Sequence, residues 1–264
     1  EDDVKKPRFS FYTPGRVCAA FIHDSSAAAS KWVYSHEYGR HILENFTDGQ
    51  VRTLSYENVR TDGEVDQAVE DAVRRGANVI FTTTPKLLLS SVRQAALHPD
   101  VKILNCSLNT SYPSVRTYYP RLYGAKFIKG AIAGTLTRDG CIGYVADYPT
   151  YGSIASINAF AQGARMVNAN ARIYLDWAHL RDGGAVGRLQ AQGIVYIDYL
   201  DRLAASTGTQ MGNRHNLALI QTHWGRLYQS LVRRVMEGSW KQEDQGSSAV
   251  NYWWGMEQGV VSVL

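Results

Sequence analysis

The stretch 16–26 (RVCAAFIHDSS) decides the fold, because an apolar run passes directly into polar residues. A run so rich in Val, Ala, Phe and Ile is typical of a central strand in a parallel sheet. The same order recurs where 82–85 (TTTP), 105–107 (NCS) and 147–149 (DYP) follow their own apolar runs and precede helix-like segments. In open α/β sheets, ligands bind outside the carboxyl ends of the strands. The sequence therefore predicts a small-molecule site built from strand ends, rather than a catalytic centre or a nucleic-acid surface.

Strand-like and helix-like segments alternate along the whole chain, which predicts parallel sheets with right-handed crossovers. The expected strands are 16–24, 51–59, 78–84, 101–108, 141–147, 171–177, 193–199, 216–223 and 259–264. The expected helices are 30–46, 61–75, 85–97, 114–137, 153–167 and 225–237. Thr61 and Glu64 have the spacing of a capping box and predict the start of the second helix.

The elements divide into an N-terminal arm and two α/β lobes. Residues 1–15, interrupted by Pro7, Pro14 and Gly15, form the expected arm. The first lobe is predicted from 16–108 plus about 224–245, and the second from 109–223 plus about 252–264. The chain is expected to cross between the lobes near 108–112 and again near 221–224.

Composition excludes several classes of function. Of the 264 residues, 45% are hydrophobic and 20% charged, and no apolar stretch has the length of about 18 residues that a membrane span needs. The net charge of +4 is too small and too scattered to indicate nucleic-acid binding. Cys18, Cys106 and Cys141 lie in apolar surroundings and are expected to be buried thiols. The histidines show no metal-ligand spacing, so we expect no metal and no cofactor.

Catalytic motifs are not found in the sequence. It contains no GxSxG, no P-loop and no pair of carboxylates at glycosidase spacing. We therefore expect a binding protein rather than an enzyme. The start, 1–6 (EDDVKK), has no apolar signal core, so we expect either that a signal has been removed or that a longer chain precedes it.

Ordered segments carry a family resemblance. They are 31–40 (KWVYSHEYGR), 98–102 (HPDVK), 140–146 (GCIGYVA), 157–165 (INAFAQGAR), 222–225 (THWG) and 252–261 (YWWGMEQGVV). In this order they resemble segments of the basic membrane protein family of ABC-transporter substrate-binding lipoproteins, in its purine-nucleoside receptor group. Lys31 stands where the family has a glycine.

The resemblance implies a type I periplasmic-binding-protein fold, with two parallel-sheet lobes that close about a hinge on a purine stacked between aromatic rings. It implies an extracytoplasmic, membrane-anchored lipoprotein that passes its ligand to an ABC transporter permease. The alternative is a cytoplasmic ligand-sensing domain of a regulatory protein, which the charged start and reduced cysteines would also suit. A third possibility, an enzyme that hydrolyses nucleosides, lacks the clustered aspartates such sites use.

One segment departs from the family pattern. The stretch between Asp182 and Asn216 is shorter than in the family, and the family's ribose-contacting Asp-Ser-Asp segment has no clear counterpart there. A buried ribose without partners for its hydroxyls costs about 1–3 kcal/mol per unsatisfied group. The departure therefore favours a free purine base, or another flat ring, over a nucleoside.

The candidate ligand-binding residues follow strand ends or carry aromatic rings: Asp24, Ser25, Trp32, Thr83, Thr84, Ser107, Tyr119, Asp147, Tyr148, Trp177, Asp198 and Trp224. Trp32 and Trp177 are expected to stack on the ligand from different lobes, while the aspartates read ring N–H groups.

Several candidates also have a structural interpretation, and Trp32 could be a half-buried tryptophan that packs between the lobes. Asp24 and Ser25 have the residue types of a helix cap, and the threonines suit a turn. Tyr119 could serve lobe packing, Trp224 could pack the hinge, and Asp198 could be a solvated loop acid.

Overall fold

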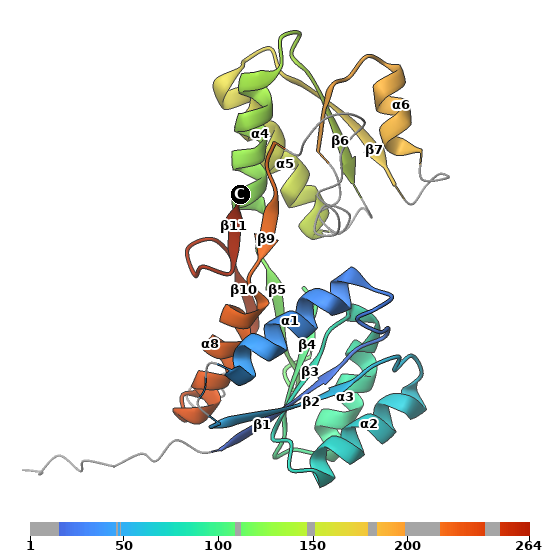
Figure 1. The fold of residues 1–264 in the computed structure, drawn as a ribbon, viewed down its shortest axis with the longest axis vertical. Helices are drawn as coiled ribbons and strands as arrows, with labels where there is room; N and C mark the ends of the chain where they lie inside the picture. The colour runs from blue at the N-terminus through green and yellow to red at the C-terminus, as the bar shows by residue number, and fades with distance from the viewer. Residues whose placement is uncertain are drawn as a thin grey trace, which may run out of the picture.

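The structure is a computed structural model that describes residues 16–45, 47, 49–108, 112–146, 151–178, 184–198, 217–240 and 249–264. Figure 1 shows two lobes, one above the other, joined by strands. Each lobe has a parallel sheet with helices on both faces. The predicted α/β class is therefore confirmed.

The first lobe contains most of the N-terminal half of the chain. Its elements are β1 (Val17–Ile22), α1 (Lys31–Asn45), β2 (Val51–Tyr56), α2 (Asp62–Arg74), β3 (Val79–Thr82), η1 (Pro85–Leu87), α3 (Leu88–Leu97), β4 (Lys102–Cys106), β5 (Arg116–Pro120), α8 (Trp224–Met236) and β10 (Asn251–Trp254). The six strands pair in the order β10-β5-β4-β3-β1-β2, and every pair is parallel. The predicted capping box of α2 is confirmed, since the Glu64 N–H donates to the Thr61 hydroxyl at 3.3 Å.

The apolar run of β1 is buried along its whole length because both faces of the sheet are covered. Alternate residues of a strand point to opposite faces. Val17, Ala19 and Phe21 pack into the cluster on the α1 and α8 side, while Ala20 and Ile22 pack into the cluster on the α2 and α3 side. Helices on both faces explain why the strand has no polar position between its ends.

The second lobe is smaller. It contains α4 (Tyr123–Leu136), β6 (Cys141–Ala146), α5 (Tyr151–Val167), β7 (Arg172–Trp177), α6 (Ala185–Ala191) and β8 (Tyr196–Asp198). The strands pair in the parallel order β7-β6-β8. Phe160 and Ala164 of α5 cover one face of β6, and Ala185 and Leu189 of α6 pack on Val145 at the other.

The chain passes between the lobes three times, after β5, before α8 and after β10. The segments between the lobes include an antiparallel pair, β9 (Ile220–Thr222) with β11 (Val261–Val263). Figure 1 shows this pair between α8 and the helices of the second lobe.

The prediction of one long helix over 114–137 is wrong in its first part. Arg116–Pro120 forms β5, which pairs with β4, and only Tyr123–Leu136 is helical. Strand β10 was not predicted, and it pairs with β5 in the first sheet. Both strands therefore belong to the first sheet, although the predicted boundaries put 109–223 and about 252–264 in the second lobe. The physical reason is that two aromatic-rich strands, distant in sequence, complete each other's hydrogen bonding.

The cysteines differ in exposure. Cys18 and Cys106 are buried free thiols as predicted, whereas Cys141 is a free thiol that is only half-buried.

Helices α4 and α5 approach closely enough for their backbones to touch. A Cβ added at Gly130 would lie 2.0 Å from the Phe160 carbonyl oxygen, and one at Gly163 would lie 1.9 Å from the Phe127 carbonyl oxygen. These contacts are reciprocal, since each glycine faces the backbone of the other helix. Glycine is therefore the residue that permits this packing distance.

We expect Gly163→Ala to lower the melting temperature, because the new methyl group forces two packed helices apart at a cost of about 1–3 kcal/mol. The control is Gly187→Ala in α6, where nothing lies within 4 Å of the added Cβ. There the gain in helix propensity should stabilise the protein slightly, by up to about 1 kcal/mol. Thermal unfolding followed by circular dichroism measures both, and equal effects would contradict the contact.

Candidate functional site

The first sheet brings polar residues together at one edge, because its strands are all parallel. His23 follows β1, Thr83 follows β3 and Ser107 follows β4, so all lie at the carboxyl edge. In Figure 1 the arrowheads of β6 and β7 point toward the first lobe. Leu108 comes close to α5, since a Cβ added at Gly152 would lie 2.8 Å from its Cδ1. The carboxyl edges of both sheets therefore border the region between the lobes.

Trp32 lies at this edge in the first turn of α1 and is half-buried. Its indole N–H donates to the Thr83 carbonyl oxygen at 2.7 Å. The ring meets His36 and Trp224 edge to face, with centroids 4.7 and 5.4 Å away, and Tyr119 lies at 6.4 Å. Because its N–H is already bonded, the Trp32 side chain has no polar atom left for a ligand.

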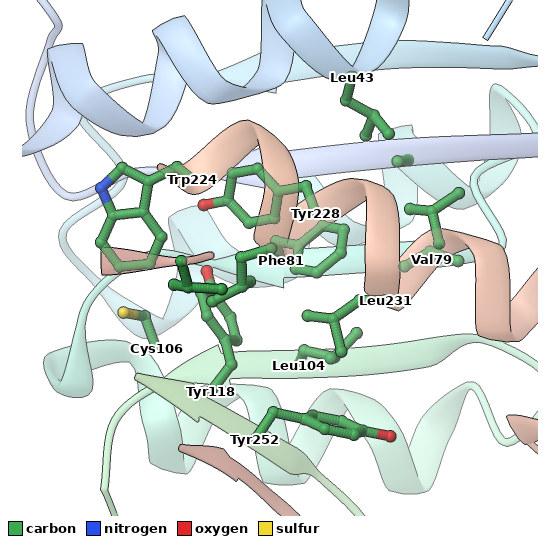
Figure 2. Packing of buried hydrophobic residues seen from close by; sticks show 14 of the residues in the cluster. Leu43, Val79, Phe81, Leu104, Cys106, Tyr118, Trp224, Tyr228, Leu231 and Tyr252 are labelled. Carbon is green, nitrogen blue, oxygen red and sulfur yellow. The ribbon is translucent and has the colours of Figure 1, made fainter. Parts of the chain in front are cut away.

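An aromatic cluster supports Trp32 from the α8 side. The His36 ring stacks on Trp224 at 3.9 Å, and its Nδ1 is hydrogen-bonded to the Tyr228 hydroxyl. Figure 2 shows Trp224 and Tyr228 of α8 lying against the side chains of Phe81 and Tyr118. Burial, with a smaller effect of His23, lowers the pKa of His36 well below its ordinary value, so the ring is neutral near pH 7. Trp224 is itself buried and belongs to this packing.

His23 bridges two elements beneath Trp32. The ring is fully buried, with Nδ1 at 2.8 Å from the Thr83 hydroxyl oxygen and Nε2 at 2.9 Å from Glu37 Oε1. Thr83 follows β3 and Glu37 lies in α1. His23 therefore connects the helix that carries Trp32 to the strand end that Trp32 also contacts.

Glu37 is held by several donors. The Arg40 guanidinium donates to both carboxylate oxygens, at 2.8 to 3.0 Å, and the Ser55 hydroxyl donates at 2.9 Å. Burial alone would raise the pKa of Glu37, but the hydrogen bonds from His23 and Arg40 outweigh it and lower the pKa from 4.5 to about 2. The carboxylate is therefore charged at neutral pH and fixes α1 to β2.

Asp24 and Ser25 lie in the loop after β1 and are half-buried. Asp24 Oδ2 accepts from the exposed Lys86 ammonium at 3.2 Å, and its carbonyl accepts from Arg60 Nε at the same distance. The Ser25 carbonyl accepts from the Asn58 N–H at 3.3 Å. An exposed ion pair of this kind contributes little to stability, so Asp24 can exchange partners.

Thr84 and Ser107 are buried. The Thr84 hydroxyl accepts from the Lys86 N–H at 3.4 Å and caps η1, and its carbonyl accepts from Asn105 Nδ2 at 2.9 Å. Among the residues that the structure describes, the Ser107 hydroxyl has no hydrogen-bond partner. The hydroxyl groups of Thr83 and Thr84, both predicted as ligand-binding residues, are therefore already hydrogen-bonded within the protein.

The second lobe places Trp177 at the end of β7, half-buried against the cluster that contains Phe160. Asp198 ends β8 and is buried, with Lys126 Nζ at 2.6 Å and Lys129 as a second ion-pair partner. Burial would raise the pKa of Asp198, but the two ammonium groups outweigh it and hold the pKa below its usual range. The predicted residues Asp147 and Tyr148 lie outside the described residues.

Three further observations concern the described residues. Within the described ranges, no group of three His, Cys, Asp or Glu side chains could hold a metal ion. In those same ranges, no helix has the length and apolar character needed to span a membrane. A hollow of about 400 Å³ lies on α4 and is lined by Phe127, Ile128, Ala131, Ile132, Thr135, Leu136 and, from α5, Met166. That hollow includes no strand-end residue.

His23, in the stretch 16–26, and His36 and Glu37, in the stretch 31–40, are not among the ligand-binding residues expected from the sequence. His36 follows Trp32 by four positions, which places both on one helix face. That spacing was a usable signal. Lys126 and Lys129, three apart on α4, carry the same signal.

The sequence is similar to known ligand-binding proteins. Residues 16–208 match the family described as ABC transporter substrate-binding protein PnrA-like. A purine-binding protein of Brucella abortus (strain 2308) is 25% identical over 269 residues, covering 94% of this chain and 75% of that protein.

Solved structures show the same fold at low identity. An ABC transporter system solute-binding protein from Conexibacter woesei DSM 14684 has a TM-score of 0.68 and 12% identity, covering 94% of this chain and 88% of that one. A transcriptional activator of the comK gene from Bacillus halodurans has a TM-score of 0.68 and 17% identity, covering 94% and 89%. Both likenesses concern the fold alone. The predicted periplasmic-binding fold is confirmed.

We expect Glu37 to make stability pH-dependent in acid. Its pKa is lowered from 4.5 to about 2 in the folded protein. A lowered carboxylate pKa stabilises the folded state above the unfolded pKa, and this contribution is lost as the pH falls through the folded pKa. The difference in melting temperature between wild type and Glu37→Gln should therefore be largest above pH 4.5 and shrink toward pH 2.

The control is Glu70→Gln, at an exposed position on α2. It shows whether removing another carboxylate from this lobe changes the pH dependence of the melting temperature in the same way. A wild-type-to-Glu37→Gln difference that stays constant from pH 6 to about 2 would contradict the network.

Proposed function

Because the chain belongs to the family of PnrA-like ABC transporter substrate-binding proteins, we propose that it captures a purine base or nucleoside between its two lobes. The observation that carries the proposal is Trp32, a half-buried indole at the carboxyl edge of the first sheet whose N–H is satisfied by Thr83. A ring face of this kind suits a flat heterocycle. The purine-binding relative from Brucella supports the same ligand class.

The proposed site takes groups from both lobes. Trp32, Tyr119, Asp24 and Ser25 are the partly exposed candidates of the first lobe, and Trp177 is the aromatic candidate of the second. The half-buried Asp24 would accept a ring N–H, exchanging its exposed partner Lys86 for the ligand. Ser107, Thr83, Thr84, Trp224 and Asp198 are buried. We assign these five to the support of the site rather than to direct contact.

Closure would occur about the three segments that join the lobes. Arg121 donates its N–H to the Trp254 carbonyl at 2.7 Å, and the His223 N–H donates to Val260 at the same distance. These bonds keep the joining segments together as a unit. We propose that the closed form, in an extracytoplasmic lipoprotein, presents the ligand to an ABC transporter permease without chemical change to the ligand.

Trp32→Ala should weaken purine binding by about tenfold or more, because base–aromatic stacking contributes roughly 1–3 kcal/mol. Isothermal titration with adenine, guanine, adenosine, guanosine, inosine and xanthine provides the measurement. The matched control is Tyr34→Ala, an exposed aromatic residue on the same helix. Binding unaffected by Trp32→Ala would rule out the platform, and no binding of any purine by wild type would reject the ligand class.

The base should bind at least as tightly as its nucleoside, because the family's ribose-contacting segment has no clear counterpart in this sequence. Adenine and adenosine titrated side by side in one buffer test this. Adenosine binding tenfold more tightly, about 1.4 kcal/mol, would show that ribose recognition is retained by other residues. Chromatography of the adenosine after incubation should return it unchanged, as expected of a binding protein.

A further inference from the structure

We propose that His23 is a positioning residue for Trp32. It ties α1 to the end of β3 and so fixes the orientation of the indole on which the ligand stacks. The inference rests on the proposed function for the identity of the ligand. The positioning itself is a property of the protein without ligand.

Two links join the same two elements side by side. The Trp32 indole N–H runs from α1 to the Thr83 carbonyl at 2.7 Å. The His23 ring spans from the Thr83 hydroxyl, at 2.8 Å, to Glu37 of α1, at 2.9 Å. The His23 link therefore sets the distance between α1 and Thr83, and the hydrogen bond from Trp32 to Thr83 depends on that same distance.

The His23 link is rigid at both ends. The imidazole is a planar ring, so its two nitrogens stand at a fixed distance. Glu37 is itself held by Arg40 and by Ser55 of β2. Thr83 is anchored through its N–H, which donates to the Ile22 carbonyl at 3.0 Å.

The Trp32 ring depends on this rigidity. It has one hydrogen bond, to Thr83, and edge-to-face contacts with His36 and Trp224. Edge-to-face contacts tolerate rotation more readily than a hydrogen bond does. Loss of the fixed spacing would therefore release the indole, and binding would then have to order it again.

His23 acts through its neighbours rather than on the ligand. Its side chain is fully buried, and both ring nitrogens are engaged by Thr83 and Glu37. It therefore offers a ligand no free polar atom. This separates it from Asp24, the next residue, which is partly exposed.

The first test is hydrogen exchange of the Trp32 indole N–H in the unliganded protein, with the signal assigned by its loss in Trp32→Phe. His23→Asn removes the hydrogen bond to Glu37, because the asparagine side chain is too short to make it. Thr83→Val removes the hydroxyl, while Thr83→Ser keeps it. We expect exchange to accelerate about tenfold in His23→Asn and Thr83→Val, the ratio for one net hydrogen bond of about 1.4 kcal/mol.

Controls separate positioning from general destabilisation. Thr83→Ser and Tyr34→Ala, an exposed residue on α1, should leave the exchange rate unchanged. Unchanged exchange in both His23→Asn and Thr83→Val would overturn the proposal. If His23→Asn fails to fold, the Val and Ser variants at position 83 decide, since they differ in the hydroxyl and retain His23.

The second test is a double-mutant cycle with adenine titration. His23→Asn should weaken binding about tenfold in wild type and have no further effect in a Trp32→Ala background, because it acts through that ring. Additive effects would overturn the positioning role. If wild type binds no purine, the proposed function fails, and the exchange measurement still decides the role of His23.

Discussion

Parallel pairing of the six strands of the first sheet is the constraint on which the site depends. It brings the ends of β1, β3 and β4 to one edge, so His23, Thr83 and Ser107 converge although they are far apart in sequence. Burial of β1 on both faces leaves its ends as the places for polar groups. The buried polar groups at that edge then need partners, and His23 and Thr83 find them in each other. An antiparallel sheet would place the ends of neighbouring strands at opposite edges and would not produce this convergence.

Local patterns predicted most elements of the fold, because strand burial and helix capping are local in sequence. The apolar run before His23 and the Thr61 capping box are examples, and the structure confirms both. Strands β5 and β10 were missed for a physical reason. Each is short and aromatic, and the two strands pair with each other across more than a hundred residues, as Tyr118 opposite Tyr252 shows. Such a pairing leaves no periodic signal in either segment.

The convergence of the first-lobe candidates at the strand ends was predictable, but which of their polar groups have partners within the protein was not. The position of Trp32 follows from its distance beyond a strand end and from family resemblance. Whether a strand-end polar group is free depends on residues that fold against it. Asp198 ends a strand, where an acid that binds a ligand is expected. Its carboxylate is nevertheless paired with Lys126, 72 residues earlier in the sequence. The Thr83 hydroxyl likewise meets His23, 60 positions away.

The first lobe uses its buried hydrogen bonds for rigidity, and this has a consequence for selectivity. With the Trp32 N–H and the Thr83 hydroxyl both engaged, the proposed platform would offer only a ring face, which any flat heterocycle could use. Discrimination among rings then has to come from partly exposed polar groups, of which Asp24 is the clearest in the first lobe. An ordered platform lowers the entropic cost of stacking for every flat ligand equally. In the proposed site, affinity and selectivity would therefore reside in different residues, and mutations would change one with little effect on the other.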